Sequence, residues 1–235
     1  GMMKARLGCG LRAAVLVLAR VLIFTSLGRD HLWSDEGDTA VLARNILKFG
    51  VPTAWDGVTF TDSDFGARLT DDFVMVSSPW LQYYVAAASL AVFGETALAA
   101  RLPFALLGLA TILLAYLTVW RVAQNRWTAA SAALLLTLSV QFLIYARQSR
   151  HYTLHAALTC LLVFQFSRLD SWRRSLVFAV ISILLFHSHP IAVAPLVALG
   201  IMTLVYKPVR AQRPWFWRAM PITALFTVPW FALAR

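Results

Sequence analysis

The segment Arg29–Gly50, RDHLWSDEGDTAVLARNILKFG, opens the one long polar stretch of this chain, which continues to Pro79. Everywhere else, apolar runs are joined by short connectors rich in Arg and Lys. This segregation favours a membrane protein that carries out its chemistry at one face. The polar stretch holds nine of the eleven acidic residues: Asp30, Asp35, Glu36, Asp38, Asp56, Asp62, Asp64, Asp71 and Asp72.

Composition supports the membrane interpretation. The chain is 60% hydrophobic and 14% charged, with a mean hydropathy of +0.68, whereas about a quarter of the residues of a soluble domain are charged. The net charge of +10 could indicate nucleic acid. The basic residues lie at the ends of apolar runs, however, so the bias of cytoplasmic loops toward Lys and Arg explains them better and no nucleic-acid partner is predicted. Cys9 and Cys160 are too few for a disulfide framework or a metal knuckle.

The apolar runs predict an all-α, polytopic integral membrane protein with about seven to eight transmembrane helices, since a crossing helix needs about 20 residues or a few fewer. We expect one transmembrane domain over residues 1–235, with a first outer loop at 29–79. No small-residue cleavage site follows the first run, which predicts an uncleaved signal anchor. The last run ends just before Arg235, so we expect a truncated C-terminus. The runs are 13–27, 79–93, 102–120, 129–145, 152–166, 176–186, 191–206 and 215–234.

Within the outer loop, the pattern of residues 36–49 is helical, with Leu42 and Ile46 on one side and Arg44, Asn45 and Lys48 on another. Gly and Pro at positions 50 and 52 end this pattern. An amphipathic helix beside a membrane span is expected to lie in the interface plane. Residues 51–78 show no period, and irregular loops of this length are usually functional or mobile.

The short run 79–93 decides the topology. If it crosses the membrane, strict alternation places the basic connectors at 121–126, 168–174 and 207–218 outside, which reverses the usual bias. If it is re-entrant or interfacial, these connectors lie inside with the basic N-terminus, which is then cytoplasmic. We prefer the second alternative, although 15 residues can cross a thin bilayer. It places these candidate residues on one outer face: Asp35, Arg101, Arg147, Arg150, His151, His187 and His189.

Asp35 and Glu36 are the candidate catalytic residues. As acids in the first turn of a helix they would complement the helix dipole by about 0.3–1 kcal/mol, and this structural role is one reading. The other is general-base catalysis, in which a carboxylate at the boundary of membrane and water accepts a proton from an acceptor hydroxyl.

A second cluster, ARQSRHY at 146–152, supplies Arg147, Arg150, His151 and Tyr152 as candidate substrate-binding residues. Such residues are often only interfacial anchors. On the outer face cations are disfavoured, however, and Arg suits bidentate contacts with phosphate, so an anionic partner is the functional interpretation.

The motif HSHP at 187–190 places His187 and His189 beside a proline that could aim both inward, or it is merely a polar turn. A metal site needs more ligands than this motif offers. No metal ligand is assigned, and a divalent metal is left open. Arg101, which precedes Leu102 and Pro103, is either part of a helix start or a further phosphate contact.

Taken in order, these motifs resemble those of the lipid-linked-sugar glycosyltransferases of the GT-C superfamily, and most of all family 39, which includes the protein O-mannosyltransferases. No single motif is specific, whereas the ordered set is, and it covers residues 11–206. The matching segments are Trp33-Ser34-Asp35-Glu36, Ala43-Arg44-Asn45-Ile46-Leu47, Phe93-Gly94-Glu95, Ala100-Arg101-Leu102-Pro103, Arg147–Tyr152 and His187-Ser188-His189-Pro190.

The resemblance implies an enzyme of the bacterial inner or plasma membrane whose site faces the periplasm or lumen. Such an enzyme transfers a sugar from a polyprenyl-phosphate carrier to a glycan, lipid or protein acceptor, among membrane lipids. Asp35 matches the family's catalytic acidic residue, with Glu36 beside it, while Arg101 matches an arginine near the site and Arg150 lies in the segment that approaches the donor. The family's His-Pro-Pro element reads Ser-Ser-Pro at 77–79. Family members are also longer, so this chain resembles their N-terminal portion.

Two other functions fit the same residues. A transporter or flippase of an anionic lipid-linked substrate would use the cations for binding without breaking a bond. A non-catalytic membrane scaffold would leave the outward arginines unexplained.

Overall fold

The computed structural model describes residues 2–61 and 69–233, with residues 2–9 as backbone only. Within these ranges the chain is helical, with three isolated β-bridges in the loop after the second helix and no strand. Asp62 and Asp64 lie outside the described residues. The helices are α1 Met2–Phe24, α2 Ser34–Phe49, α3 Leu81–Phe93, α4 Ala97–Ala123, α5 Arg126–Leu138, α6 Val140–Ala146, α7 His151–Phe166, α8 Trp172–Ser188, η1 Pro190–Ala192, α9 Val193–Val205, η2 Lys207–Gln212, α10 Arg213–Thr227 and α11 Trp230–Leu233.

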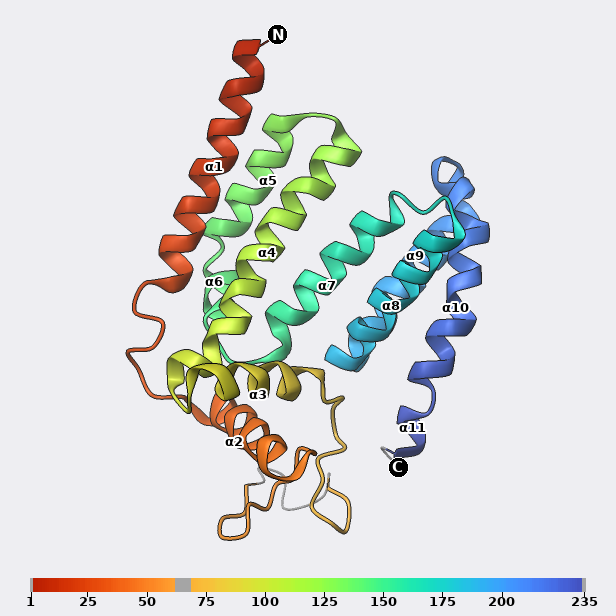
Figure 1. The fold of residues 1–235 in the computed structure, drawn as a ribbon. Helices are drawn as coiled ribbons and strands as arrows, with labels where there is room; N and C mark the ends of the chain where they lie inside the picture. Colours follow the sequence, from red (N-terminus) through yellow and green to blue (C-terminus); the bar gives the residue numbers. More distant parts are fainter. Residues whose placement is uncertain (1, 62–68, 234–235) are drawn as a thin grey trace.

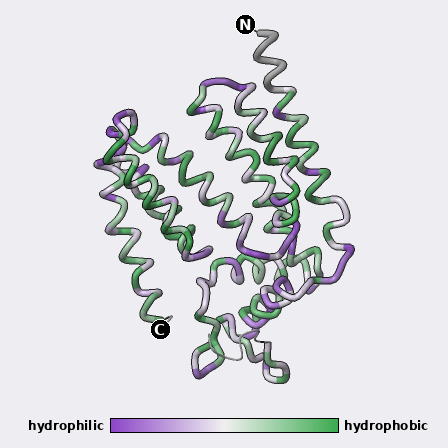
Figure 2. The backbone as a smooth tube through the Cα atoms, turned by 180° about the vertical axis from the view of Figure 1, so that it is seen from behind, coloured by the Kyte–Doolittle hydropathy of each residue, from purple (hydrophilic) through white to green (hydrophobic). Residues whose placement is uncertain are grey.

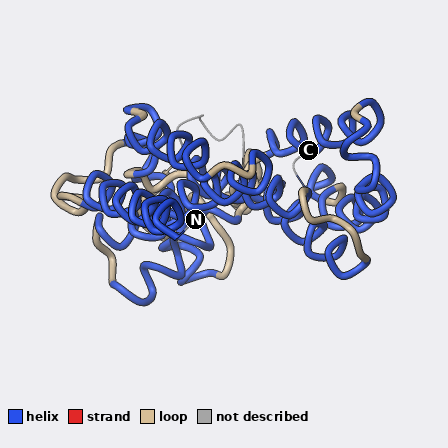
Figure 3. The backbone as a smooth tube through the Cα atoms, turned by 90° about the horizontal axis from the view of Figure 1, so that it is seen from above, coloured by secondary structure: helices blue, strands red, loops and turns tan. Residues whose placement is uncertain are grey.

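The long helices form a bundle that stands on a base made of α2, α3 and the loop between them (Figure 1). Helix α7 packs between α4 and α8 and so joins the group α1, α4 and α5 to the group α8, α9 and α10. Seen from above, these two groups lie side by side (Figure 3). Hydropathy follows the same division, because the bundle helices are largely apolar and polar residues gather at their ends and in the base (Figure 2).

Three buried clusters hold this arrangement together. One joins α7 to α8 and α10 around Phe178 and Phe216. A second joins α1 to α4 and α5 around Ile23 and Ile112. The third lies between the base and the bundle, where Leu42 of α2 packs with residues of α3, α4 and α7. The third cluster is the one that fixes the position of α2, and it therefore sets the geometry of the site described below.

The helix predicted over residues 36–49 is present as α2, which begins two residues earlier than expected. Gly50 ends it with φ +80°, a left-handed conformation that favours glycine, and its N–H donates to Ile46 O. One detail is wrong: Asn45, expected on the polar face, is buried, and its Nδ2 donates to Thr53 O over 2.7 Å. The side-chain amide therefore ties the loop after α2 to the helix.

The predicted run 129–145 is broken rather than continuous. Ser139 has an extended backbone and its Oγ accepts the N–H of Phe142, which caps a new helix. As a result α5 and α6 meet at an angle of 68°. The last predicted run is also divided, because α10 ends at Thr227 and the short α11 begins at Trp230.

The expected number of membrane crossings is not confirmed. By length and composition, α4 is the one described helix able to cross a membrane alone, and two bent pairs bring the total to at most three. The pairs are α5 with α6, and residues 190–205 with 207–233, which are bent by 109°. The short run 79–93 forms α3, which is apolar but only 13 residues long and lies across the base (Figure 1).

Charge is distributed between the two ends of the bundle. The turns α4–α5, α7–α8 and α9–α10, which carry the basic connectors, lie at the end far from the base (Figure 1). The α6–α7 turn, the start of α4 and the end of α8 lie at the base (Figure 1). The fold thus gathers the predicted site segments at one end and most connector arginines at the other.

Candidate active site

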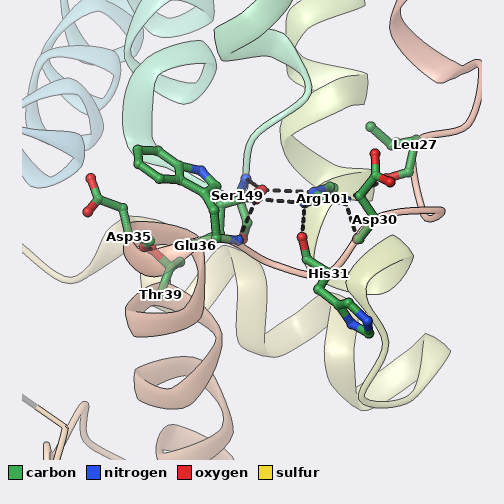
Figure 4. Close-up of polar contacts among 9 residues, drawn as sticks. Leu27, Asp30, His31, Asp35, Glu36, Thr39, Arg101 and Ser149 are labelled. Atoms are coloured by element: carbon green, nitrogen blue, oxygen red, sulfur yellow. Dashed lines mark hydrogen bonds and ion pairs between the residues drawn. The ribbon is translucent and has the colours of Figure 1, made fainter.

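Asp35 lies in the first turn of α2, at the junction of base and bundle. Its side chain is 39% exposed, and its Oδ2 lies 3.2 Å from Nη2 of Arg150. Arg150 also donates from Nη1 to the Asp35 carbonyl oxygen over 3.2 Å. Figure 4 shows the Asp35 carboxylate directed away from Arg101, whereas Glu36 faces Arg101. Asp35 therefore presents a solvent-accessible carboxylate beside a guanidinium.

Glu36 is turned inward and only 1% exposed. Both of its oxygens accept from Arg101: Oε2 from Nη2 over 2.7 Å and Oε1 from Nε over 2.9 Å. Oε1 also accepts the backbone N–H of Ser149 over 2.8 Å (Figure 4). Oε2 accepts the backbone N–H of Trp33 as well, over 3.4 Å. Four charge-assisted donors around one buried carboxylate are a strong arrangement. Glu36 thus binds the start of α2 both to α4 and to the α6–α7 turn.

Arg101 extends this network to the end of α1. Its Nη1 donates to the carbonyl oxygens of Leu27 and Asp30 over 3.0 and 2.9 Å, and its Nη2 donates to His31 O over 3.0 Å. The guanidinium is thereby engaged by the protein itself. Arg101 was predicted to belong to a helix start or to contact a phosphate, and in this structure it lies in α4 and binds Glu36 and three backbone carbonyls.

Arg147, in the turn between α6 and α7, also binds backbone carbonyls of the protein, as Arg101 does. Its Nη1 donates to Leu22 O and Ile23 O, over 2.9 and 3.2 Å. A cation at the last carbonyls of a helix complements the helix dipole, so Arg147 caps α1. Of the three predicted arginines, the structure leaves Arg150 as the one that faces the Asp35 carboxylate.

The turn between α6 and α7 is held close to α4. A Cβ added at Gly108 would lie 2.9 Å from the Cβ of Ala146, so glycine allows this approach. Thr153 Oγ1 donates to Phe104 O over 2.8 Å and fixes the first turn of α7. Arg150 is the residue that precedes α7, and no side chain caps this helix. Its first-turn N–H groups therefore add to the positive potential beside Arg150.

Three consecutive residues of this turn have buried polar atoms that, within the described residues, meet no hydrogen-bond partner. They are Gln148 Oε1, Ser149 Oγ and Arg150 Nε. Ser149 is fully buried. Buried polar groups in proteins are nearly always paired, so this turn has hydrogen-bonding capacity that the fold does not use.

The histidines divide into two groups. His151 at the start of α7 stacks on His189, with ring centroids 4.5 Å apart and planes 21° apart. Tyr152 lies beside His151 and packs on Tyr145. His187, in contrast, contacts Phe226 O over 3.1 Å and the ring of Trp230. The structure thus brings His151, Tyr152 and His189 to the cluster and places His187 against α10 and α11.

Sequence analysis missed two members of the site. The backbone N–H of Ser149 binds Glu36, and its side chain carries no sequence signal for this role. His155 lies one turn after His151 and its ring meets His189 edge-on, with centroids 6.4 Å apart. The spacing of four residues that places His151 and His155 on one helix face is the signal that could have found it.

No three His, Cys, Asp or Glu side chains within residues 2–61 and 69–233 are placed to share a metal ion. Two described cavities lie elsewhere. One, of about 200 Å³, lies on the far side of α2 between Leu32, Arg44 and Glu95. The other, of about 370 Å³, is apolar and lies between α9 and α10 around Gly200. Asp35 and Arg150 line neither of these two cavities.

A family model for dolichyl-phosphate-mannose-protein mannosyltransferases matches residues 77–232. The chain belongs to this family. An uncharacterized protein of Aquifex aeolicus (strain VF5) is 29% identical over 134 residues, which cover 57% of this chain and 24% of that protein. The crystal structure of ArnT from Cupriavidus metallidurans in the apo state matches 96% of this chain with a TM-score of 0.63 and 21% sequence identity. This chain covers 42% of ArnT.

The family match and the structural match show that this chain is a member of the GT-C superfamily and has the fold of a membrane protein. The expected resemblance is thereby confirmed. The family match begins at residue 77, after Asp35 and Glu36, so the assignment of these two residues depends on the geometry above. The chain spans about a quarter of the Aquifex relative and less than half of ArnT.

Proposed function

We propose that this chain carries the donor site of a membrane glycosyltransferase, which transfers a sugar from a polyprenyl-phosphate-linked donor to an acceptor at the outer face. The observation that supports this most is the contact of Asp35 with Arg150. In an in-line displacement the general base and the cation for the leaving phosphate lie on opposite sides of the reacting carbon, so the substrates would enter between these two groups and separate them. The two groups lie 3.2 Å apart, and Asp35 is open to solvent.

In the proposed step, an acceptor hydroxyl oxygen attacks the anomeric carbon of the donor. The bond between this carbon and the phosphate oxygen breaks, and the polyprenyl phosphate leaves with the electron pair. Asp35 takes the hydroxyl proton, and its Oδ1 is suited to this because Oδ2 faces Arg150. A single displacement of this kind inverts the configuration at the anomeric carbon.

Arg150 would stabilise the negative charge that develops on the leaving phosphate. Preorganised cations and N–H donors are worth most where the charge forms in the transition state. The uncapped first turn of α7 and the unpartnered Arg150 Nε lie at this same point. His151 and Tyr152 are proposed to line the donor site beside Arg150.

Glu36, Arg101 and Arg147 take positioning roles in this proposal rather than the direct roles expected from the sequence. Each is bound within the protein: Glu36 with Arg101, and Arg147 at the end of α1. Their effect would be to hold Asp35 and Arg150 in register, which matters because misplacement by about 1 Å can cost on the order of a hundred-fold in rate. His187 is left out of the site.

For the membrane, we propose that seven helices cross the bilayer: α1, α4, the bent pair α5–α6, α7, α8, α9 and α10. Helix α3 would lie with α2 at the outer interface. The N-terminus and the basic turns would then be cytoplasmic, in agreement with the bias toward basic cytoplasmic loops. The acceptor is proposed to be a glycan, a lipid or a protein.

The transfer of labelled sugar from a polyprenyl-phosphate donor tests the proposal. The full-length purified protein is mixed with the labelled donor and with a membrane extract as the source of acceptor. Release of polyprenyl phosphate together with labelled acceptor is the expected result. The alternative, a transporter or flippase, would move the intact donor across a vesicle membrane without splitting it, so intact donor on the far side would overturn the enzyme proposal.

A further inference from the structure

The ring of His189 has one nitrogen whose state is fixed by the backbone. His189 precedes η1, and its Nδ1 accepts the N–H of Ile191 over 3.2 Å. A nitrogen that accepts a hydrogen bond carries no proton. In a neutral imidazole the proton must then lie on the other nitrogen, Nε2.

The surroundings of His189 favour this neutral form. Burial, and after it the positive charge of Arg150, holds the pKa of His189 below its usual value. The ring also stacks on His151 at 4.5 Å, and a positive charge on His189 would be repelled by the Arg150 guanidinium. His189 therefore presents a neutral Nε2–H donor at physiological pH.

This donor is not used by the fold. Among the described residues no protein group bonds to His189 Nε2, and the residue is half-buried rather than enclosed. Stacking on His151 places it next to Arg150, the residue that precedes His151 in the chain. The charge of Arg150 also acts on His189, so this ring lies near the guanidinium proposed to hold the leaving group.

We propose that His189 Nε2–H donates a hydrogen bond to a phosphate oxygen of the lipid-linked donor, alongside Arg150. This inference rests on the proposed function, and it names a further donor-binding residue within that site. Phosphate oxygens only accept hydrogen bonds, so a neutral N–H matches them. A neutral donor also avoids a second positive charge beside Arg150.

In the neighbouring His155 the proton lies on the other ring nitrogen, Nδ1, as the contacts of Ser188 show. Ser188 Oγ donates to Leu185 O over 2.6 Å, so its single hydrogen is used. Its contact of 3.1 Å with His155 Nδ1 must then be a bond that His155 donates. A neutral His155 therefore has an unprotonated Nε2, which cannot donate to a phosphate oxygen. The two rings therefore differ in function. His155 binds Ser188 at the end of α8, and His189 offers an N–H group to a ligand.

Two substitutions separate the nitrogens of His189. His189→Asn places a carbonyl oxygen near the position of Nδ1, so it keeps the acceptor for Ile191 N–H, and it ends short of Nε2. His189→Gln carries an amide N–H to the region of Nε2 and gives up the acceptor. Each variant is thus the matched control for the other, and His31→Asn controls for the loss of one exposed outer-face imidazole.

The experiment measures binding of a polyprenyl monophosphate and of the corresponding polyprenol to the full-length protein in detergent. We expect His189→Asn to weaken binding of the monophosphate about ten- to a hundred-fold, the usual cost of losing a hydrogen bond to a charged group. Binding of the polyprenol should not change. His189→Gln should stay within a few-fold of wild type for the monophosphate, and its unfolding temperature should fall.

Three other results of the binding experiment would each contradict one part of the proposal. If wild type prefers the monophosphate and His189→Asn does so equally, the assignment of His189 is wrong while the proposed function stands. If both the Asn and the Gln variant lose monophosphate binding equally, the effect comes from a changed backbone around residues 189–191 and not from the loss of Nε2–H. If wild type does not distinguish the monophosphate from the polyprenol, the proposed donor class itself is wrong.

Discussion

Asp35 Oδ2 and Arg150 Nη2 lie 3.2 Å apart although 115 positions of sequence separate them. Beside this contact, Glu36 and Arg101 form a second ion pair that is almost completely buried, with side chains 1% and 9% exposed. Two adjacent acidic residues thus meet two different arginines. The first pair is open to solvent at Asp35, and the buried pair helps to fix where Asp35 lies.

The buried pair leads to a prediction about stability. Removing one partner of a buried ion pair leaves an uncompensated charge and usually costs about 3–5 kcal/mol. We expect Glu36→Gln and Arg101→Ala each to lower the unfolding temperature of the purified protein strongly. Arg101→Lys should also destabilise, because one ammonium cannot reach both the carboxylate and the carbonyls of Leu27, Asp30 and His31.

An exposed ion pair provides the control for this prediction. Asp170 and Arg174, one turn apart at the start of α8, have side chains that are 65% and 38% exposed. Exposed pairs are worth at most about 1 kcal/mol. Asp170→Asn should therefore shift the unfolding temperature little. An Arg101→Ala protein as stable as Asp170→Asn would show that the buried network is not what holds α2 to the bundle.

Arg150 leads to a prediction about donor binding. Arg150→Ala removes the guanidinium, and binding of a polyprenyl monophosphate should weaken about ten- to a hundred-fold. Arg150→Lys keeps the charge but loses the paired N–H donors of the guanidinium, so it should weaken binding less than Arg150→Ala does. The exposed Arg173→Ala at the far end of the bundle serves as control. Unaltered binding in Arg150→Ala would remove Arg150 from the donor site.

The distribution of charge leads to a prediction about orientation. In a protein without Cys9 and Cys160, Asp71→Cys on the loop between α2 and α3 should react with an impermeant maleimide in intact cells. Asp170→Cys, exposed at the opposite end of the bundle, should react only after the cells are opened. The reverse pattern would place the Asp35 site in the cytoplasm.

His189 leads to a prediction about pH. Its pKa is lowered in the fold, so the unfolded chain binds the proton more readily below a pH of about 6.5. Stability is then present above this pH and is lost as the pH falls. The charged and titratable groups that face His189 are Arg150, His151 and His155. Between pH 7 and 5.5 the unfolding temperature should fall less steeply in His189→Asn than in wild type, and equal slopes would contradict this.

The sequence was enough to predict much of the fold. The periodicity of residues 36–49, ended by Gly50 and Pro52, was sufficient for α2. The segregation of acids and bases was sufficient to place Asp35 and Arg150 at one end. The helical period depends only on neighbouring residues, and the charge bias is a sum over segments of the chain. Both can therefore be recognised without knowing which distant residues are in contact.

Other features depend on contacts between distant residues. Successive residues of a helix point about 100° apart, so of Asp35 and Glu36 only one can face inward. Which one does so is decided by Arg101, 65 positions away. The break at Ser139 has the same origin, because serine is compatible with a helix and becomes a cap only where the chain must turn. The spacing of His151 and His155 places both on one helix face, but it does not show the contact of His155 with Ser188, 33 positions away.

Asp35 leads to the prediction on which the proposed mechanism depends most. If Asp35 acts only in the first turn of α2, Asp35→Asn should be nearly neutral, because the side chain is 39% exposed and Asn has almost the same shape. If Asp35 is the general base, the same change removes proton acceptance and should slow sugar transfer about 10²–10⁴-fold. Binding of the monophosphate should change much less, since Arg150 remains.

The assay is the transfer of labelled sugar from polyprenyl-phosphate donor by the full-length protein, with the unfolding temperature measured in parallel. Asp71→Asn, at an exposed aspartate of the loop between α2 and α3, is the matched control and should keep wild-type turnover. Glu36→Gln cannot serve as this control, because Glu36 binds Arg101 and Ser149. A stable Asp35→Asn protein that transfers sugar at the wild-type rate would leave Asp35 as a helix-start residue and require another base.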